Sequence, residues 1–446
     1  MSKYIPNTDK QIKEMLSDIG MSDIKDLFSN IPDEVKMNRK LNLPKPMSEM
    51  EIESHSRQIS GLNRNIKENI CFLGAGAYDH YIPSVIPHLL SRQEFYTAYT
   101  PYQPEISQGT LQAIFEYQTM ICMLTGMDVC NASMYDGATA LAEAAALASS
   151  STKRSEILIA KTVHPESREV LKTYSKFNGN TVTEFGYVDG TADILDIKSK
   201  LSSNTAAVII QTPNFFGIIE EMAQIAQMVH ENKSLLIVSC DPISLGILKS
   251  PGELGADIVV GEGQSLGTPL NFGGPYLGFF AAAKEHMRKM PGRIVGESTD
   301  KDGNRGFVLT IQTREQHIRR EKATSNICSN EALNALAAAI YLTTMGKQGL
   351  RKVATQCVQK SHYAYNQLIS TNFFKPVFNS AFFKEFILQY DGNINQLNKK
   401  LLNSNILGGY SLSNDYPELK DTWLVAVTEK RTKEDIDLLV EKAVAK

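Results

Sequence analysis

The chain has 446 residues, of which 42% are hydrophobic and 21% are charged, and its formal net charge is −3. This length exceeds that of a usual single-core protein, so we expect one large and one smaller domain. The small net charge gives no case for nucleic acid or an anionic membrane as a partner, and no apolar run approaches the ~20 residues of a membrane span.

The N-terminus and the cysteines indicate the compartment. The first residues lack the apolar core of a secretory signal, so the sequence predicts a cytoplasmic protein. Six cysteines are scattered along the chain with no Cys-x-x-Cys spacing, which predicts reduced and mostly buried thiols. We therefore expect no metal site.

Residues 1–65 alternate short helical patterns with helix breakers. The helical patterns cover three stretches: 9–19, 22–28 and 48–62. Ser48 is expected to cap the third helix, because Glu51 stands three residues later at the capping-box position. This region predicts a helical arm that lies on another surface, rather than a domain with its own core.

An aromatic stretch from Phe95 to Glu105 carries Tyr96, Tyr99 and Tyr102 together with prolines at 101 and 104. Because proline disfavours helix in itself and in the residue before it, we expect these tyrosines on an extended loop. Tyrosine joins a large apolar ring to a polar tip. The rings therefore either pack against the body of the domain or form the wall of a pocket or interface.

A loop around residues 131–136 leads into an alanine-rich helix near Leu141. Helix N-termini bind anions through their free N–H groups, so this turn is a candidate phosphate site. Asp136, however, stands about where the N-cap belongs. Its carboxylate would satisfy the same N–H groups and repel a phosphate. The sequence favours plain helix capping here.

Short β-branched runs then alternate with helical patterns. The predicted strands are 157–160, 206–210, 235–240 and 256–260, and the predicted helices between them include 165–174 and 222–230. Strands that alternate with helices predict a mainly parallel sheet covered on both faces. The fold class is therefore α/β for the large domain.

A glycine-studded loop follows Val260 and leads to an apolar run from Leu277. The pattern predicts strand, irregular loop, strand, with the loop at a carboxyl end where α/β proteins place their chemistry. In pyridoxal-phosphate (PLP) enzymes of the aspartate aminotransferase type I fold, such a segment carries the Schiff-base lysine. No lysine occurs here between Lys249 and Lys284. Asp241, after the preceding strand, either pairs with a pyridine nitrogen or forms an Asp-Pro turn.

A basic segment from Gln312 to Asn326 contains arginines at 314, 319 and 320 and a histidine at 317. The interleaved Glu315 and Glu321 favour a solvated, salt-bridged surface. Clustered arginines with a histidine also suit a carboxylate or phosphate. The sequence leaves both readings open for Arg314 and His317.

The last quarter of the chain predicts a smaller α+β domain. A helix from Asn330 to Met345 is expected to end at Gly346. Beyond it the predicted elements are strands near 385–388 and 423–427 and a final helix over 433–444. The expected organisation is an arm (1–65), a large PLP-transferase-like α/β domain (66–346) and a small C-terminal domain (347–446).

Four segments resemble sequences of the glycine cleavage system P-protein family, glycine dehydrogenase (decarboxylating): residues 99–109, 291–296, 312–320 and 323–328. The likeness covers most of the chain from about residue 65. Some organisms join two homologous halves in one chain, and others separate them. This chain resembles the first half, subunit 1 or α, which lacks the PLP lysine. The second half carries the PLP lysine in a His-Lys pair. Counting forward from Ala256-Asp257 places Gln264-Ser265 at that pair, and a serine cannot form the aldimine.

The resemblance implies several partners and roles. The chain is expected to pair with a PLP-carrying subunit 2, in an αβ pair that dimerises to α2β2, and to bind no PLP covalently itself. The pair would decarboxylate glycine and pass the aminomethyl group to the lipoyl arm of the H-protein. The implied site residues are Thr324 or Ser325, donating to the partner-held PLP, and Tyr96, Tyr99, Tyr102, Arg314 and His317 at a pocket or interface.

Two other functions compete with this one. A free-standing PLP lyase or transferase would use another lysine, and Lys161 at the end of its predicted strand is the best placed. A structural or regulatory paralogue would bind the partner without shaping its site. Absorbance near the aldimine band distinguishes the first alternative, and partner activity with and without this chain distinguishes the second.

Overall fold

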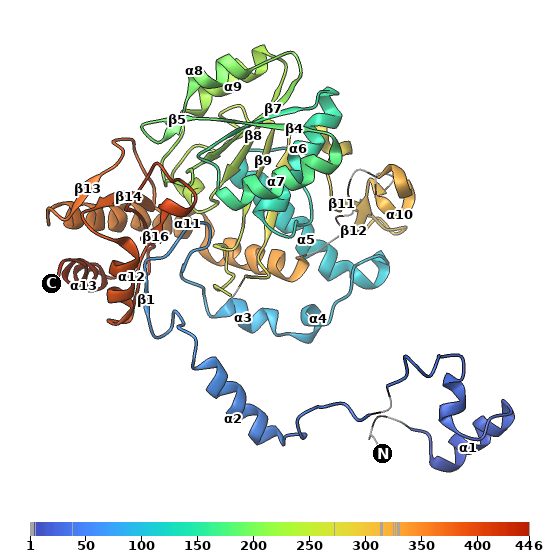
Figure 1. Cartoon of the computed structure of the whole chain (residues 1–446). Helices are drawn as coiled ribbons and strands as arrows, with labels where there is room; N and C mark the ends of the chain where they lie inside the picture. Colours follow the sequence, from blue (N-terminus) through green and yellow to red (C-terminus); the bar gives the residue numbers. More distant parts are fainter. Residues whose placement is uncertain are drawn as a thin grey trace. The chain divides into compact units, whose positions relative to one another are not determined.

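The computed structural model describes residues 4, 6–37, 39–271, 273–312, 315–323, 325, 327 and 331–445. The chain forms two compact units, Met1–Arg64 and Asn65–Lys446 (Figure 1). Among the described residues, no helix combines the length and the apolar character needed to cross a bilayer.

The N-terminal unit consists of short helices without a core. It contains α1 (Asp9–Asp18), a 3-10 helix (Ile24–Phe28) and α2 (Glu49–Ser60). The predicted cap of α2 is confirmed, because Ser48 accepts from the Glu51 N–H and the Glu51 side chain accepts from the Ser48 N–H. Leu16 is the one buried residue among those described in this unit. Since helices this short are marginal in water, they need a surface to pack on.

The second unit is built on a seven-stranded sheet of order β2-β10-β9-β8-β7-β3-β4. The strands are β2 (Val129–Cys130), β10 (Gly278–Ala282), β9 (Ile258–Glu262), β8 (Leu235–Cys240), β7 (Thr205–Thr212), β3 (Glu156–Ala160) and β4 (Thr181–Phe185). Neighbours from β9 to β4 run parallel, whereas β10 is antiparallel to both β9 and β2. The predicted α/β fold with a mainly parallel sheet is confirmed.

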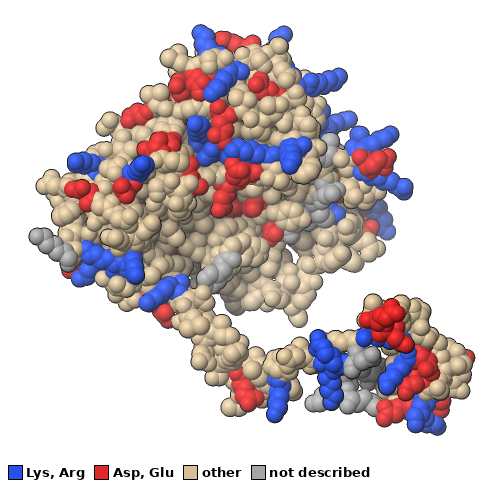
Figure 2. Space-filling model, viewed as in Figure 1, with Lys and Arg blue, Asp and Glu red and all other residues tan. Residues whose placement is uncertain are grey.

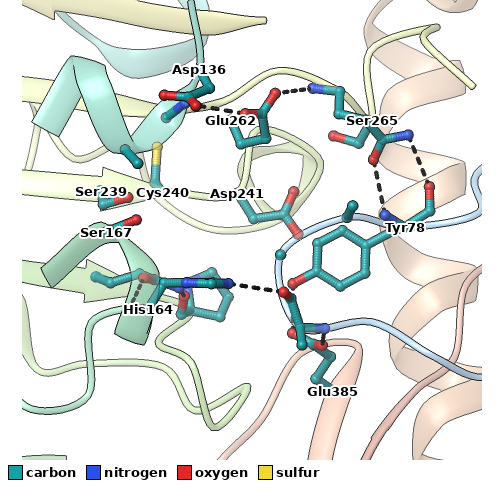
Figure 3. A pocket seen from close by; sticks show the side chains of 18 of the residues that line it. Tyr78, Asp136, His164, Ser167, Ser239, Cys240, Asp241, Glu262, Ser265 and Glu385 are labelled. Atoms are coloured by element: carbon teal, nitrogen blue, oxygen red, sulfur yellow. Dashed lines mark hydrogen bonds between the residues drawn. The ribbon is translucent and has the colours of Figure 1, made fainter. Parts of the chain in front are cut away.

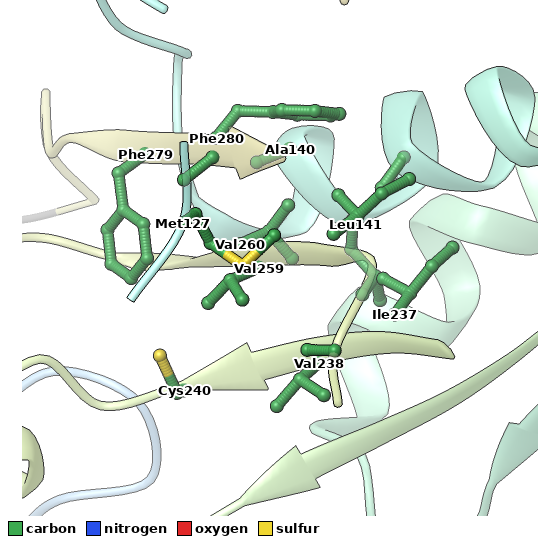
Figure 4. Packing of buried hydrophobic residues seen from close by; sticks show 14 of the residues in the cluster. Met127, Ala140, Leu141, Ile237, Val238, Cys240, Val259, Val260, Phe279 and Phe280 are labelled. Atoms are coloured by element: carbon green, nitrogen blue, oxygen red, sulfur yellow. The ribbon is translucent and has the colours of Figure 1, made fainter. Parts of the chain in front are cut away.

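Helices cover this sheet because its strands are apolar on both faces. The helices of this region are α5 (Pro104–Thr125), α6 (Gly137–Thr152), α7 (Pro165–Asn178), α8 (Ile194–Lys200) and α9 (Met222–Glu231). Helix α6 packs across β7 to β10. Figure 4 shows Ala140 and Leu141 of α6 among the buried side chains of the central strands. The small alanines let the helix lie close to the sheet, which brings its N-terminus to the strand ends.

A second, four-stranded sheet of order β13-β14-β17-β16 follows near the C-terminus. Its strands are β13 (Phe374–Pro376), β14 (Glu385–Tyr390), β17 (Thr422–Ala426) and β16 (Tyr410–Ser411), accompanied by α12 (Ile394–Leu402) and α13 (Lys433–Val444). This sheet has its own apolar cluster around Trp423. The strands near 385 and 423 and the last helix were predicted, and they are confirmed. The division of the chain at residues 65 and 346 stays a prediction.

Two local predictions are wrong. Tyr96 closes a short helix, α4 (Gln93–Tyr96), which follows α3 (Val85–Leu90), so it does not lie on an extended loop. Pro104 starts α5 instead of excluding a helix, because the first helical position needs no N–H donor.

The helix expected to end at Gly346 is interrupted at that residue, as predicted. Helix α11 runs over Ala332–Ile369, with Gly346 as a non-helical residue inside it at φ +58°. The glycine at positive φ therefore separates two helical segments by a kink, and the second segment, which the sequence did not predict, follows directly.

Candidate functional site

A cavity of about 310 Å³ lies at the carboxyl ends of β7, β8 and β9 (Figure 3). This is the edge of a parallel sheet at which α/β proteins bind ligands. Its polar lining comes from distant parts of the chain: Tyr78, Asp136, His164, Glu166, Gln211, Asp241, Glu262, Gln264, Ser265, Lys384 and Glu385. The predicted glycine loop after β9 forms one wall, as expected from its position between β9 and β10.

Ser265, which the sequence predicts at the position of the PLP lysine, lines this cavity. It is 4% exposed, and its hydroxyl has no hydrogen-bond partner among the described residues. The neighbouring Gln264 fastens the loop, because its side chain accepts from the Tyr78 N–H at 2.9 Å and donates to the Tyr78 and Thr268 carbonyls at 3.1 and 2.7 Å. The backbone is therefore held in place around a serine, where no aldimine can form.

Two carboxylates occupy the N-terminus of α6. Asp136 caps the helix by accepting from the Thr139 N–H at 2.7 Å, which confirms the predicted capping. Glu262, at the end of β9, accepts from the Gly137 N–H at 3.1 Å and from Leu277 and Gln264 at 3.0 Å each. Burial raises the pKa of Glu262 to about 8. These acids take the N–H groups of Gly137 and Thr139, and their negative charge opposes a phosphate at this turn.

Asp241 carries out two roles at the end of β8. Its Oδ1 accepts from the Ile243 N–H at 3.0 Å, so the predicted Asp-Pro turn is confirmed. Its Oδ2 lies 2.6 Å from Nζ of Lys384, which enters from the residue before β14 and is 2% exposed. The carboxylate that the sequence offered to a pyridine nitrogen is thus already paired with Lys384.

Sequence reasoning missed Lys384. The signal was a Lys-Glu pair at 384–385 between the apolar pairs Phe382-Phe383 and Phe386-Ile387, because buried strands rarely carry charge without a partner. Glu385 lies in the same wall, where it accepts from the Tyr78 hydroxyl at 2.6 Å and from the Ala75 N–H at 2.7 Å. Burial raises the pKa of Glu385 to about 7.

A buried polar chain extends from Lys384 away from the cavity. Lys384 lies 2.9 Å from Nε2 of His80, whose Nδ1 lies 2.7 Å from Glu429. Burial opposes ionisation of Glu429, but the His80 ring and the Tyr81 N–H hold its pKa down to about 2. His80, Cys357 and Glu429 bring ligand-type atoms within 4.8 Å of one another. Both nitrogens of His80 have these hydrogen-bond partners, so hydrogen bonding accounts for this cluster.

The tyrosines divide into two groups. Tyr96 and Tyr99 are 70% and 82% exposed and line a separate surface cavity of about 280 Å³, together with Leu333 and Leu336 of α11. Tyr102 instead packs under the guanidinium of Arg293, 4.5 Å from its ring centre, and accepts from Arg293 Nη2 at 3.0 Å. Internal packing therefore explains Tyr102 but not the other two rings.

Of the remaining predicted site residues, the described ones, His317 and Ser325, do not line the first cavity. Arg314 and Thr324 fall outside the described residues. His317 is exposed beside Glu315, with 3.6 Å between Nδ1 and Oε2, in the short helix α10 (Gln316–Arg319). Ser325 donates to Glu143 at 3.0 Å, a carboxyl whose pKa burial raises to about 7. Lys161, the lysine of the competing hypothesis, is exposed and does not line the cavity.

The residues present do not fit a PLP of the chain's own. PLP needs an amine for its aldimine, N–H donors for its phosphate and a carboxylate for its pyridine nitrogen. Ser265 supplies no amine, Asp136 and Glu262 take the Thr139 and Gly137 N–H groups, and Lys384 pairs with Asp241. Of the three groups that PLP needs, the amine is therefore absent, and the N–H donors and the carboxylate are engaged by other side chains of this chain.

Relatives with the same description match this chain over nearly its whole length. A "Probable glycine dehydrogenase (decarboxylating) subunit 1" from Carboxydothermus hydrogenoformans is 56% identical over 439 residues, 98% of each chain. The relative of the same description from Desulforamulus reducens is 55% identical over 440 residues, 99% of each chain.

Two solved structures are also similar. A glycine decarboxylase (P-protein) of the glycine cleavage system, in inhibitor-bound form, matches with a TM-score of 0.91 and 41% identity over 99% of each chain. The Burkholderia pseudomallei sphingosine-1-phosphate lyase shares the fold alone, with a TM-score of 0.67 and 12% identity over 93% of each chain. The family model described as "Glycine cleavage system P-protein" matches residues 2–442. Since this match spans nearly all of the sequence, the chain belongs to the glycine cleavage system P-protein family.

Proposed function

We propose that this chain is subunit 1 of a glycine dehydrogenase (decarboxylating), which acts together with a PLP-carrying subunit 2. The observation that supports the proposal is the cavity at the sheet's carboxyl edge, which is lined by Ser265, Glu262 and Lys384 and receives no lysine from the loop after β9. A chain of this family without a working cofactor site of its own requires a second chain to supply one. The free-standing PLP enzyme and the purely regulatory paralogue are not favoured.

The proposal includes the wider assembly. Subunit 2 would hold PLP, the pair would decarboxylate glycine, and the aminomethyl group would pass to the lipoyl arm of the H-protein, in the cytoplasm. The expected stoichiometry is α2β2. Thr324 or Ser325 would donate to the PLP of the partner, with Arg314 and His317 adding positive potential. The hydroxyl hydrogen of Ser325 already goes to Glu143, which favours Thr324 for this contact.

The cofactor assignment predicts that the purified chain forms no covalent PLP adduct. After incubation with PLP and borohydride, peptide mass spectrometry should find no phosphopyridoxyl-lysine on this chain and one on subunit 2. Ser265→Lys is the matched control. It should also fail to form a stable internal aldimine, because Asp136, Glu262 and Lys384 still oppose the phosphate and the ring. A stoichiometric adduct on any lysine of the wild-type chain, Lys161 and Lys384 included, would refute the assignment.

The exposed tyrosines predict a role in turnover without a role in stability. Tyr96→Phe or Tyr99→Phe should lower glycine decarboxylation by the assembled pair, because a phenol hydroxyl facing the partner's pocket is lost. The melting temperature should stay nearly unchanged, since both rings are mostly exposed in this chain. Tyr102→Phe is the comparison, and it should cost stability through the lost Arg293 hydrogen bond, about 0.5–1.5 kcal/mol. Full turnover in both exposed variants would show that these hydroxyls are dispensable.

A further inference from the structure

One buried arginine contacts two other segments that resemble the P-protein family. Arg293 lies in the segment 291–296, immediately before β11 (Ile294–Thr299), and is 3% exposed. Its guanidinium lies 4.5 Å from the ring centre of Tyr102 and donates from Nη2 to the Tyr102 hydroxyl at 3.0 Å. Its Nε lies 3.4 Å from Oε2 of Glu315. A single buried cation therefore joins two stretches of chain that are far apart in the sequence.

The backbone around Arg293 is held by the body of the second unit. The Ala132 N–H donates to the Arg293 carbonyl at 2.7 Å. Gln118 of α5 accepts from the Val295 N–H at 3.0 Å and donates to the Val295 carbonyl at 2.9 Å. Gly292 forms the turn before Arg293 at φ +72°, a backbone region that favours glycine. The arginine side chain therefore starts from a fixed point.

Arg293 holds Tyr102 without burying it. The face of an aromatic ring attracts a guanidinium, yet the Tyr102 side chain is still 57% exposed. The Tyr102 N–H donates to the Thr100 carbonyl at 2.8 Å, and Pro101 between them has a fixed φ. Restraining Tyr102 therefore also restrains the exposed Tyr99 just before this turn.

Glu315 extends the restraint to α10. Glu315 is 9% exposed, and its carbonyl accepts from the N–H groups of Ile318 and Arg319 at 3.1 and 2.8 Å, which starts the helix. A buried carboxylate needs a cation, and Arg293 supplies one. Helix α10 presents His317 and Arg319 to solvent, and Figure 2 shows Lys and Arg side chains exposed on this flank of the second unit. Since so short a helix is not stable alone, its place depends on this anchor.

Both contacts require the shape of arginine. A planar guanidinium can stack on a ring and still donate from its edges, whereas the ammonium of lysine is a point charge. We propose that Arg293 is a positioning residue for glycine decarboxylation, which holds the tyrosine stretch (residues 96–102) and α10 in one arrangement toward subunit 2. This inference rests on the proposed function, in which both stretches face the site of the partner. Because Arg293 is buried, it acts through Tyr102 and Glu315.

Turnover of the assembled pair tests this role. Arg293→Lys keeps a cation beside Glu315 but loses the combination of stacking and edge donation. The measurement is release of CO2 from glycine by subunit 2 with lipoylated H-protein and a saturating excess of this chain. The kcat should fall about ten- to a hundredfold, because small misplacements of groups at a reacting centre cost this much. The KM for glycine should change less, since no contact with the substrate is removed.

The outcomes separate the inference from the proposed function. If the wild-type pair releases no CO2, the proposed function is wrong and the inference is wrong with it. If the wild type is active and Arg293→Lys is equally active, the inference alone is wrong. It is also wrong if the whole loss lies in weaker pairing with subunit 2, which the excess of chain would restore. Tyr363→Phe is the matched control, because it loses a hydroxyl bond of 2.7 Å to Asp437 of α13 and should keep full turnover.

A second pair of variants leaves Arg293 in place and serves if Arg293→Lys folds poorly. Tyr102→Phe removes the acceptor at one end of the guanidinium, and Glu315→Gln removes the charge at the other. Each should lower kcat. Losses at independent sites multiply, whereas changes that act through one shared side chain do not. The double variant should therefore lose clearly less than the product of the two single losses. Losses that multiply would show two separate contacts and would overturn the coupling by Arg293.

Discussion

Replacing Lys384 by methionine is expected to lower the free energy of unfolding by about 3–5 kcal/mol. The ammonium is 2% exposed and lies 2.6 Å from Asp241 and 2.9 Å from Nε2 of His80. Methionine fills a similar volume, so the change removes the charge and little of the packing. Asp241 would remain in a mostly buried position without its cation, and removing one partner of a buried ion pair costs more than removing both. Urea denaturation of the purified chain measures the loss.

Two further variants test the cause of this loss. Lys172→Met breaks ion pairs with Glu169 and Glu184 on the surface, at 2.7 and 3.0 Å, and should cost at most about 1 kcal/mol. The double variant Lys384→Met, Asp241→Asn should recover part of the stability, because no buried carboxylate is left unpaired. An equal loss in the Lys172 and Lys384 variants would contradict the buried pair as the source of stability.

Deleting residues 1–60 is expected to abolish pairing with subunit 2. The arm buries Leu16 alone among its described residues, while it exposes many large apolar side chains, including Ile19, Leu43, Met50 and Leu62. Apolar surface of this extent indicates an interaction site, and obligate interfaces typically bury more than ~2,000 Å². Size-exclusion chromatography of the truncated chain mixed with subunit 2 measures the loss as separate elution of the two chains.

The same deletion should leave the remaining fold intact, because Asn65–Lys446 is a compact unit by itself. Its circular dichroism and melting temperature should match those of the full chain. Deleting residues 1–7, which precede the capping residue Thr8 of α1, is the matched control and should preserve pairing. If the chain without residues 1–60 still co-elutes with subunit 2, the arm is not required for the interface.

Features governed by neighbouring residues could be predicted from the sequence. Ser48 with Glu51 and Asp136 at α6 are caps, and a cap depends on side chains within three residues of the helix start. The strand-loop-strand pattern around Ser265 followed from the β-branched run before it and the glycines after it. The missing lysine at this loop is a fact of sequence alone. It sufficed to predict a chain that forms no aldimine at this position.

The tertiary structure decided what the cavity contains. Lys384 pairs with Asp241, and Glu262 accepts from the first residue of α6. In both cases more than a hundred residues of chain separate the partners, so no local sequence pattern predicts the contact. Local rules also failed for Pro104, whose missing N–H is harmless because a helix begins there. They left the place of Tyr102 open, and its contact with the distant Arg293 came only from the tertiary structure. A charge or ring is kept buried only when partners from other segments satisfy it. The sequence by itself determined the helix caps and the absence of a lysine from the loop after β9. The tertiary structure determined which distant charged side chains line the cavity.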